Sequence, residues 1–398
     1  MLKILHTSDW HLGKKLDQYS LAEAHEKFLQ DLVEFVLKDM RPDLLVVAGD
    51  IYDRPVAQTE SINLLEDTLA RIADLKIPCL ITSGNHDSRI RLGTNTRFMR
   101  NQGLHFRTRR EQISDPVTIE DEDFTLLSYG IPYLEPDADT GDEEHLWHVK
   151  ATQADVLRYA MSLINRDVAE RQKKNSKPIK VLVASHAFIV GGKSSDSERN
   201  TKVGTLGEAP SSVFEGADYV AMGHLHGAKH EISSPGSMVL RYSGSPIAYS
   251  FSERDHEKQL LLVNITKDGV SEEIQSIPIN PWRRMRQFEG TFDELKSNKI
   301  SPTDDWVKVV LTDTELPMDI EKTLRRKFAN LVEIDFKKLH VDDSFAGQGG
   351  VALSKLAPSE VMRRFVQHVT TNPTNPDLEK AIDDCCDAMN LLTVAVNK

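Results

Sequence analysis

Seven side chains of the types that bind divalent metal ions stand in five short motifs, and each motif directly follows a short apolar run. The donors are Asp9, His11, Asp50, Asn85, His186, His224 and His226. Carboxylate and amide oxygens with imidazoles, and no cysteine, suit Mn²⁺, Fe²⁺ or Zn²⁺ in a reactive site better than a structural zinc held by thiolates. The sequence therefore predicts a metal centre that performs chemistry.

Seven donors are too many for one transition-metal ion but suit two ions about 3.5–4 Å apart that share a carboxylate. We predict that Asp50 is the shared ligand. Such a pair activates water for attack on phosphorus, which predicts hydrolysis of a phosphate ester. His86 directly follows Asn85. Because an imidazole titrates near neutral pH, we predict that His86 protonates the leaving oxygen or stabilises its developing charge.

Each motif taken alone has an ordinary structural interpretation. Asp-x-His arises often by chance, and a Gly-His-x-His pair is as easily two hydrogen-bonded loop residues. The prediction rests on all five motifs occurring in this order, each after a strand-like run. The other histidines are assigned no chemistry: His6 is expected in the core, and His25, His105 and His256 at surface or loop positions.

The apolar runs before the motifs are too short for core helices and are rich in Leu, Val and Ile, which is typical of buried parallel strands. They cover residues 4–5, 44–48, 79–82, 181–184 and 219–222. In an open α/β sheet the binding crevice lies beyond the carboxyl ends of the strands, so the motifs are expected at one sheet edge. Glycines before Asp50, Asn85 and His224 predict turns with a positive φ or a close approach of the backbone.

Helical periodicity over 20–39, 58–73 and 152–165 alternates with these strands, which indicates a β-α-β layout. Two later apolar runs, 259–265 and 269–277, are expected to complete a second sheet packed against the first. The predicted fold class is therefore α/β, with two sheets between layers of helices.

The order of the motifs resembles that of the calcineurin-like metallophosphoesterases, and longer stretches narrow the resemblance to the SbcD family. That family is the nuclease subunit of the bacterial SbcCD complex. The resemblance spans at least residues 2–264 and is carried by Ile4 to Gly13, Ser195 to Arg199, Asp218 to His226, Arg241 to Ile247 and Ser250 to Glu253. It implies a four-layer α/β/β/α metallophosphoesterase sandwich with a small α/β capping domain and C-terminal helices.

Carried over position by position, the resemblance divides the ligands between two Mn²⁺ ions. One ion is assigned Asp9, His11, Asp50 and His226, and the other Asp50, Asn85, His186 and His224. His86 matches the catalytic histidine of the family. Archaeal relatives carry a histidine a few residues after the shared aspartate, where this chain has Asp53. Asp53 could take part in catalysis, or it could form hydrogen bonds to a metal ligand or within its own loop.

The implied activity is that of a Mn²⁺-dependent DNA nuclease, a 3′→5′ double-strand exonuclease and a single-strand or hairpin endonuclease. The implied partners are DNA and an SbcC-type ATPase subunit, with a homodimer inside a heterotetramer. The chain has no Gly-x-x-x-x-Gly-Lys-Ser/Thr loop, so any ATP dependence must come from that other subunit. Two alternatives stand beside this one: a phosphodiesterase of the same superfamily that does not act on DNA, and a DNA-end scaffold that does not cut.

A formal net charge of −12 argues against a DNA partner, because duplex binding relies on Lys and Arg meeting phosphates. Residues 88–110, however, contain seven arginines and no acid. A solvated charged face is the alternative interpretation for any one of them. Candidate DNA contacts are Lys14, Lys15, Arg89, Arg91, Arg97 and Arg199.

We predict three regions: a nuclease domain over 1–282, a capping domain over 283–342, and a linker with a helical ATPase-binding region over 343–398. The capping domain is expected to contain strands at 306–312 and 332–336 and a helix at 319–331. Amphipathic helices over 358–370 and 377–394 have little core of their own to join, which favours docking on a partner over packing on the cap. Apolar stretches are shorter than the roughly 18–20 residues of a membrane helix. A cytoplasmic protein without a membrane partner is expected.

Overall fold

The computed structural model describes residues 1–136, 152–190, 207–228, 232–297, 300–313 and 319–337, with 359, 363, 376 and 378–385. The chain divides into two compact units. One contains Met1–Phe288, Ser301–Val309 and Leu324–Glu333, and the other contains Glu289–Ile300, Val310–Thr323 and Ile334–Lys398.

The larger unit is built on two mixed sheets. The first has the order β15-β14-β1-β4-β5-β6, with β16 also paired to β14. Its strands are β1 (Leu2–Thr7), β4 (Leu44–Ala48), β5 (Cys79–Thr82), β6 (Leu104–Arg107), β14 (Gln259–Thr266), β15 (Gly269–Val270) and β16 (Gln275–Pro278). The second has the order β13-β12-β9-β8-β7. Its strands are β7 (Val117–Glu120), β8 (Thr125–Ile131), β9 (Ile179–His186), β12 (Tyr219–Gly223) and β13 (Val239–Tyr242).

The strands that precede the metal motifs are parallel within each sheet, as predicted from their apolar runs. β1 pairs with β4 and β4 with β5 in parallel, and β9 pairs with β12 in the same sense. Every residue of β4, β5 and β12 is buried. Strands covered on both faces need apolar side chains at every position, which explains runs without alternation.

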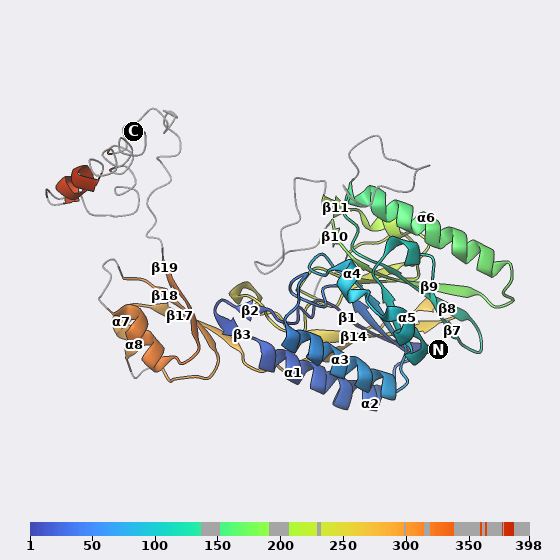
Figure 1. The fold of residues 1–398 in the computed structure, drawn as a ribbon, viewed down its shortest axis with the longest axis horizontal. Helices are drawn as coiled ribbons and strands as arrows, with labels where there is room; N and C mark the ends of the chain where they lie inside the picture. The colour runs from blue at the N-terminus through green and yellow to red at the C-terminus, as the bar shows by residue number, and fades with distance from the viewer. Residues whose placement is uncertain are drawn as a thin grey trace. The chain divides into compact units, whose positions relative to one another are not determined.

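Three hydrophobic cores separate four layers. Alternate residues of β4 face opposite ways: Leu45 and Val47 pack with Leu32 and Leu69 of the helices, whereas Val46 packs against Leu182 of the second sheet. The outer face of the second sheet packs on α6 through a third core. Figure 1 shows α6 on one side of the paired sheets and α1 and α3 on the other. This arrangement is the predicted α/β/β/α sandwich.

The main helices lie where the periodicity placed them. The first is continuous through α1 (Ala22–Asp31), the π-helical η1 (Leu32–Leu37) and α2 (Lys38–Met40), followed along the chain by α3 (Thr59–Asp74). α6 (Gln153–Gln172) begins with a capping box in which the Thr152 hydroxyl accepts a hydrogen bond from the Asp155 amide at 3.2 Å. The helix continues beyond the predicted end at residue 165. The prediction was too short because the later turns are mostly polar and exposed, so they carry no apolar period.

The remaining short elements lie in the connections. The helical ones are α4 (Arg89–Leu92), α5 (Thr96–Met99), η2 (Arg100–Gln102), η3 (Arg110–Gln112), η5 (Ser211–Phe214) and η6 (Phe251–Glu253). The strands are β2 (Lys15–Leu16), β3 (Tyr19–Ser20), β10 (Phe188–Ile189) and β11 (Glu208–Ala209). None of the helices among the described residues has the length and apolar composition to cross a membrane.

The predicted composition of the second sheet is wrong. β14, β15 and β16 over residues 259–278 extend the first sheet, where β14 pairs antiparallel with β1. The second sheet is instead formed by β7, β8, β9, β12 and β13, and β9 and β12 are two of the motif-bearing strands. An apolar run indicates that a strand is buried but does not identify its neighbour.

A small three-stranded sheet of order β17-β18-β19 follows. Its strands are β17 (Met285–Gly290), β18 (Trp306–Leu311) and β19 (Leu331–Phe336), with helices α7 (Phe292–Lys296) and α8 (Ile320–Lys327). α8 ends four residues before the predicted boundary at 331, because Leu331 is already part of β19. The rings of Phe288 and Phe328 stack with centroids 5.2 Å apart.

Little of the predicted C-terminal helix pair lies among the described residues. Residues 378–385 are helical, and Ile382 is buried. The guanidinium of Arg363 bonds Glu379 at 2.7 Å and Asp383 at 2.5 Å. The rest of the predicted helices at 358–370 and 377–394 lies outside the described residues.

Candidate metal centre

All seven predicted donors lie at the carboxyl ends of strands, but the strands belong to both sheets. Asp9 and His11 follow β1, Asp50 follows β4, and Asn85 follows β5 in the first sheet. His186 ends β9, and His224 and His226 follow β12 in the second sheet. The expectation of a single sheet edge is therefore corrected: the donors converge where the edges of two packed sheets meet.

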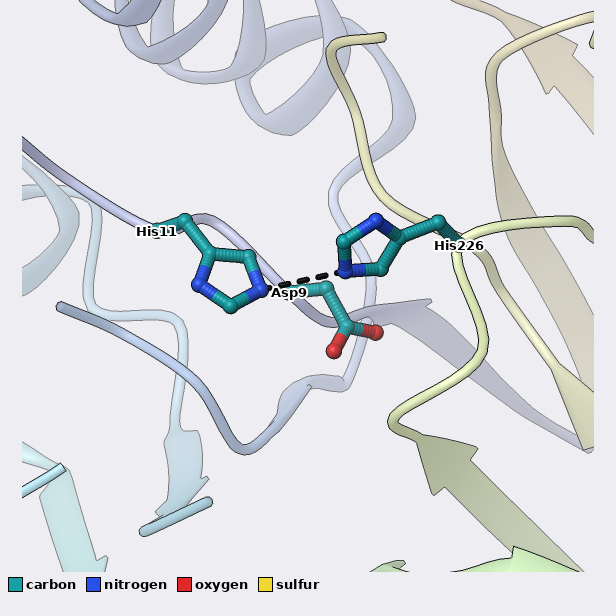
Figure 2. A group of neighbouring side chains, drawn as sticks. All are labelled: Asp9, His11 and His226. Atoms are coloured by element: carbon teal, nitrogen blue, oxygen red, sulfur yellow. Dashed lines mark hydrogen bonds between the residues drawn. The ribbon is translucent and has the colours of Figure 1, made fainter. Parts of the chain in front are cut away.

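Asp9, His11 and His226 form one group of donors, shown in Figure 2. The Nε2 atoms of the two imidazoles lie 3.1 Å apart. One donor atom from each of the three residues lies within 4.8 Å of the others. Ligand atoms that bind one ion at about 2.1 Å lie roughly 3 Å from each other, so this spacing fits a shared ion.

Asn85, His186 and His224 form a second group on the other side of Asp50. The Asn85 amide oxygen lies 2.9 Å from His186 Nε2 and 3.2 Å from His224 Nδ1. Asp50 Oδ2 is 3.3 Å from His186 Nε2 and 3.5 Å from His11 Nε2. The Asp50 carboxylate therefore lies between the two groups, where a shared ligand would have to be.

Four of the donors have a left-handed backbone, which ordinary residues rarely adopt. The φ angles are 54° at Asp9, 44° at His11, 51° at Asp50 and 104° at His224. Each such residue costs on the order of 1–3 kcal/mol and persists only where its surroundings fix it. Here the Asp9 amide donates to Gly49 O at 3.0 Å and the His11 amide to Asp50 O at 2.9 Å. These bonds hold the two loops against each other.

All three motif glycines are required by close contacts, as the sequence indicated, and a Cβ at Gly223 would lie 1.9 Å from Ala48 O. Gly49 has φ +83°, and a Cβ there would lie 2.4 Å from His186 Nδ1. At Gly84 a Cβ would lie 2.2 Å from Asp50 Oδ1 and 2.4 Å from the Asp50 amide. A side chain at Gly49 or Gly84 would displace a donor.

Two buried carboxylates make this site electrostatically suited to cations. Asp9 and Asp50 are at most 2% exposed. Burial raises the pKa of Asp9 to about 7, and the nearby Asp50 charge adds to the effect although His186 opposes it. Burial also opposes ionisation of Asp50, but His186 and His11 outweigh it and hold the pKa of Asp50 well below its usual value.

His186 shows the same balance from the other side. Burial lowers the pKa of His186, but the Asp50 and Asp9 carboxylates outweigh it and raise the value to about 9. Without an ion, a proton on His186 supplies the positive charge that the carboxylates need. The buried donor set therefore fits divalent cations, which would supply that charge instead.

The comparison with family models matches residues 2–228 to the calcineurin-like phosphoesterases and residues 281–370 to the Type 5 capsule protein repressor C-terminal domain. A protein from Staphylococcus epidermidis, described as the SbcD component of the nuclease SbcCD, is 30% identical over 372 residues, which cover 93% of this chain and 94% of that protein. The chain belongs to the SbcD family. Its fold class is that of the metallophosphoesterases.

Solved structures give more distant likenesses to this SbcD-family chain. A protein from Thermus thermophilus is 15% identical with a TM-score of 0.38, and covers 70% of this chain and 99% of its own. A protein described as a novel archaeal phosphodiesterase is 11% identical with a TM-score of 0.29, at the same coverage of both chains. These likenesses are too distant to support a conclusion.

His86 of the SbcD-family chain is anchored at the margin of the donor groups. Its backbone amide donates to Asp50 Oδ1 at 2.8 Å, and its Nδ1 lies 2.8 Å from the carbonyl oxygen of Asp53. Because a carbonyl only accepts, Nδ1 carries a proton and Nε2 is the nitrogen left for other contacts. The Asp53 carboxylate bonds Lys14 Nζ at 3.0 Å instead.

The predicted basic residues are not all placed at the donor set. Lys14 is paired with Asp53, and Lys15 is exposed on β2. Arg89 lines a groove with Asp87, Arg109 and Arg110, whereas Arg91 and Arg97 are exposed on α4 and α5. Arg199 lies outside the described residues.

Other members of the arginine-rich segment have structural roles. Arg100 and Arg107 pair with Asp115 at 2.7 and 3.3 Å. These two guanidinium groups therefore brace the loop around Asp115. The groove beside Asp87 is the part of the segment that adjoins the donor loops.

Three supporting residues were not recognised from the sequence. The Asp87 carboxylate accepts from the amides of Ile51 (3.1 Å), Tyr52 (2.9 Å) and Gly84 (2.9 Å). The buried Tyr249 ring lies 5.3 Å from the His11 ring, and Glu253 contacts His226. Asp87 had a sequence signal because it ends the Gly-Asn-His-Asp motif, and Glu253 ends the stretch from Ser250 that carries part of the family resemblance.

Among the other histidines, the prediction for His6 is confirmed and the one for His25 is wrong. His6 is fully buried and its Nδ1 lies 3.0 Å from the Tyr219 hydroxyl, as expected for a core residue. The prediction that His25 lies at the surface is wrong, because it is 1% exposed and its Nε2 is 3.4 Å from the Tyr249 hydroxyl. His25 supports the site through Tyr249, a contact that its local sequence does not reveal.

Proposed function

We propose that this chain is the nuclease subunit of an SbcCD-type complex, a Mn²⁺-dependent hydrolase of DNA phosphodiesters. The proposed activities are 3′→5′ exonuclease on double strands and endonuclease on single strands and hairpins, in recombination, replication and end processing. The observation that carries the proposal is the convergence of seven donors from two sheets in a chain that belongs to the SbcD family. The relative's description as a nuclease supports the choice of DNA.

In this proposal Asp9, His11, Asp50 and His226 hold one Mn²⁺ ion, and Asp50, Asn85, His186 and His224 hold the other. Bound ions would act as Lewis acids on the phosphate and lower the pKa of water. The chain's own residues fix the donors before any ion binds, through the strained loop backbones and the Asp87 carboxylate.

His86 is proposed to act as the general acid or as a stabiliser of charge on the leaving oxygen. The contact of Nδ1 with Asp53 O fixes the ring and reserves Nε2 for the substrate. The side chain is only about 10% exposed, so water competes little for it. General acid–base residues typically contribute about 10²- to 10⁴-fold to a rate.

For the substrate, we propose that Arg89 and the neighbouring Arg109 and Arg110 contact DNA phosphates along the groove beside Asp87. Lys14, Lys15, Arg91, Arg97 and Arg199 are further candidates. Lys14 pairs with Asp53, and Arg110 in the groove lies 3.4 Å from Glu111. For organisation, we propose a nuclease domain over 1–282, a capping domain over 283–342 and an ATPase-binding region over 343–398, in a homodimer.

The test uses the purified full chain, Mn²⁺ and an end-labelled DNA hairpin, with a small aromatic phosphodiester assayed in parallel. Asp50→Asn should abolish cleavage of both substrates. His86→Gln should reduce cleavage by about 10²-fold or more while retaining Mn²⁺ measured by titration. His105→Gln, on β6 away from the donors, is the matched control and should cut normally.

Each result has a distinct meaning. Cleavage of the hairpin by wild type and control alone supports the proposal. Hydrolysis of the small diester without DNA cleavage, even with an SbcC-type ATPase present, would replace it by a phosphodiesterase that does not act on DNA. Binding of DNA ends with no hydrolysis of either substrate would indicate a scaffold.

A further inference from the structure

A buried ion pair stands directly behind one of the proposed ligands. Glu253, at the end of η6, is 0% exposed, and its Oε1 lies 3.2 Å from His226 Nδ1. Its other oxygen bonds Lys258 Nζ at 2.5 Å. Removing two charges from water is costly, so a pair this deep needs a specific arrangement around it.

The arrangement satisfies the ammonium group completely. Lys258 Nζ donates to Glu253 Oε2, to Ser245 Oγ at 2.8 Å and to the His226 carbonyl at 3.1 Å. An ammonium group has three protons, and these three contacts use them all. The network therefore holds His226 by two hydrogen bonds, one from Lys258 to its backbone carbonyl and one from its ring to Glu253.

The contact with Glu253 selects one tautomer of His226. Because a carboxylate accepts, Nδ1 carries the proton and Nε2 presents its lone pair. That Nε2 is the atom 3.1 Å from His11 Nε2 in the first donor group. A carboxylate behind a ligating histidine fixes the ring and increases its basicity, and its loss typically weakens metal binding about 10- to 100-fold.

The second donor group lacks this device. His186 Nδ1 lies 3.0 Å from the carbonyl oxygen of Ala48, a neutral acceptor. Other carboxylate oxygens lie farther away: Asp9 Oδ1 is 4.0 Å from His186 Nδ1 and Asp53 Oδ1 is 3.8 Å from His11 Nδ1. Among the contacts described, only His226 therefore has a carboxylate within hydrogen-bond distance of its Nδ1. The two proposed ion sites therefore differ in the groups that hydrogen-bond to their histidine ligands.

We infer that Glu253 is a positioning residue that makes the ion site of Asp9, His11, Asp50 and His226 the tighter of the two. Lys258 holds Glu253 in place and prevents it from moving into the site as a ligand itself. This inference deepens the proposed function and rests on its assignment of two ions. It predicts that the site can hold one ion at concentrations where the second position is still empty.

The test is calorimetric titration of the metal-free full chain with Mn²⁺. Wild type should show two binding steps of unequal affinity. Glu253→Gln keeps an oxygen acceptor but removes the charge, and should weaken the tighter step about 10- to 100-fold while leaving the weaker one unchanged. Equal affinities in wild type, or an unchanged tighter step in Glu253→Gln, would overturn the inference.

Because Glu253→Gln leaves a buried ammonium group without its counter-charge, folding is checked by circular dichroism. The double variant Glu253→Gln/Lys258→Met removes both charges and should restore the fold but not the affinity. Recovery of wild-type affinity in the double variant would show that Glu253 only neutralises Lys258, which contradicts the inference.

Asp218→Asn is the matched control, since it breaks the Lys180–Asp218 pair of 3.1 Å elsewhere in the second sheet. It should leave both Mn²⁺ steps unchanged, and weakening in it equal to that in Glu253→Gln would contradict a specific role. DNA cleavage is measured separately. A wild type that binds Mn²⁺ in two unequal steps without cutting DNA would remove the proposed function but leave this inference standing.

Discussion

At the scale of single residues, the site separates groups that act through their side chains from groups that act through their backbone. Asp53 acts on His86 through its backbone, because its backbone carbonyl oxygen accepts a hydrogen bond from the His86 imidazole. Its carboxylate pairs with Lys14 and lies 3.8 Å from His11 Nδ1 and 3.9 Å from His86 Nδ1, beyond hydrogen-bond distance of either ring. Archaeal relatives have a histidine in place of this aspartate. We propose that Asp53 instead orients His86 through its backbone carbonyl.

Asp53→Asn should therefore reduce cleavage only a few-fold, whereas His86→Gln should reduce it by about 10²-fold or more. The substitution does not change the backbone carbonyl of residue 53, which orients His86. Single-turnover cleavage at saturating Mn²⁺ measures both variants under the same conditions. A loss in Asp53→Asn as large as that in His86→Gln would instead place the Asp53 carboxylate in the chemistry.

Metal binding should become tighter as pH rises from 6 toward 9. In the metal-free chain His186 has a pKa raised to about 9 and Asp9 a pKa raised to about 7, so both carry protons near pH 6. An ion must displace those protons to bind, and each is already lost once the pH exceeds the pKa of its group. Titration calorimetry at pH 7 in buffers of different ionisation enthalpy should report proton release, and a pH-independent affinity would contradict this.

Gly49→Ala should disrupt the donor set although it adds only a methyl group. The new Cβ would lie 2.4 Å from His186 Nδ1, on a backbone with φ +83°. Expected are weaker Mn²⁺ binding and a lower melting temperature, both measured on one preparation. Gly269→Ala provides the control, because its φ is also positive, at +125°, but a Cβ there meets no atom within 4 Å.

At the scale of secondary-structure elements, a short capping motif fixes the start of α6. The start of α6 is closed by Thr152, which accepts from the Asp155 amide while Asp155 accepts from the Thr152 amide at 2.9 Å. Thr152→Ala should destabilise the chain by about 1 kcal/mol. Urea denaturation measures this, and Ser162→Ala, at an exposed position within the same helix, should cost less because alanine favours helices.

The elements also show what can be predicted from sequence. The existence and order of β1, β4, β5, β9 and β12 were predicted because a buried strand followed by a donor motif is a local pattern. β1 and β9 continue beyond the predicted ends at residues 5 and 184, to Thr7 and His186. The neighbours of β14 were mispredicted because both faces of a buried strand are apolar and do not specify a partner. Glu253 and Tyr249 were missed for a related reason, since their roles depend on contacts with residues more than twenty positions away.

At the scale of the whole molecule, the donors join two sheets whose facing sides otherwise form a mainly apolar core. An ion that binds only the folded chain adds stability by mass action, about 2.7 kcal/mol at a concentration 100 times Kd. Mn²⁺ should therefore raise the melting temperature, and a chelator should lower it. Asp50→Asn should remove most of this response, and an equal response in wild type and variant would show that Mn²⁺ acts elsewhere.

The distribution of the donors along the chain has a consequence for protein synthesis. Asp9, His11, Asp50 and Asn85 leave the ribosome well before His186, His224 and His226, and β14 completes the first sheet later still. A nascent or truncated chain thus carries only part of the donor set, and two partial sets on separate sheets do not meet until the sandwich closes. We therefore expect no hydrolysis from a chain that ends before the second sheet is complete, so synthesis itself would delay the proposed activity until both sheets have formed.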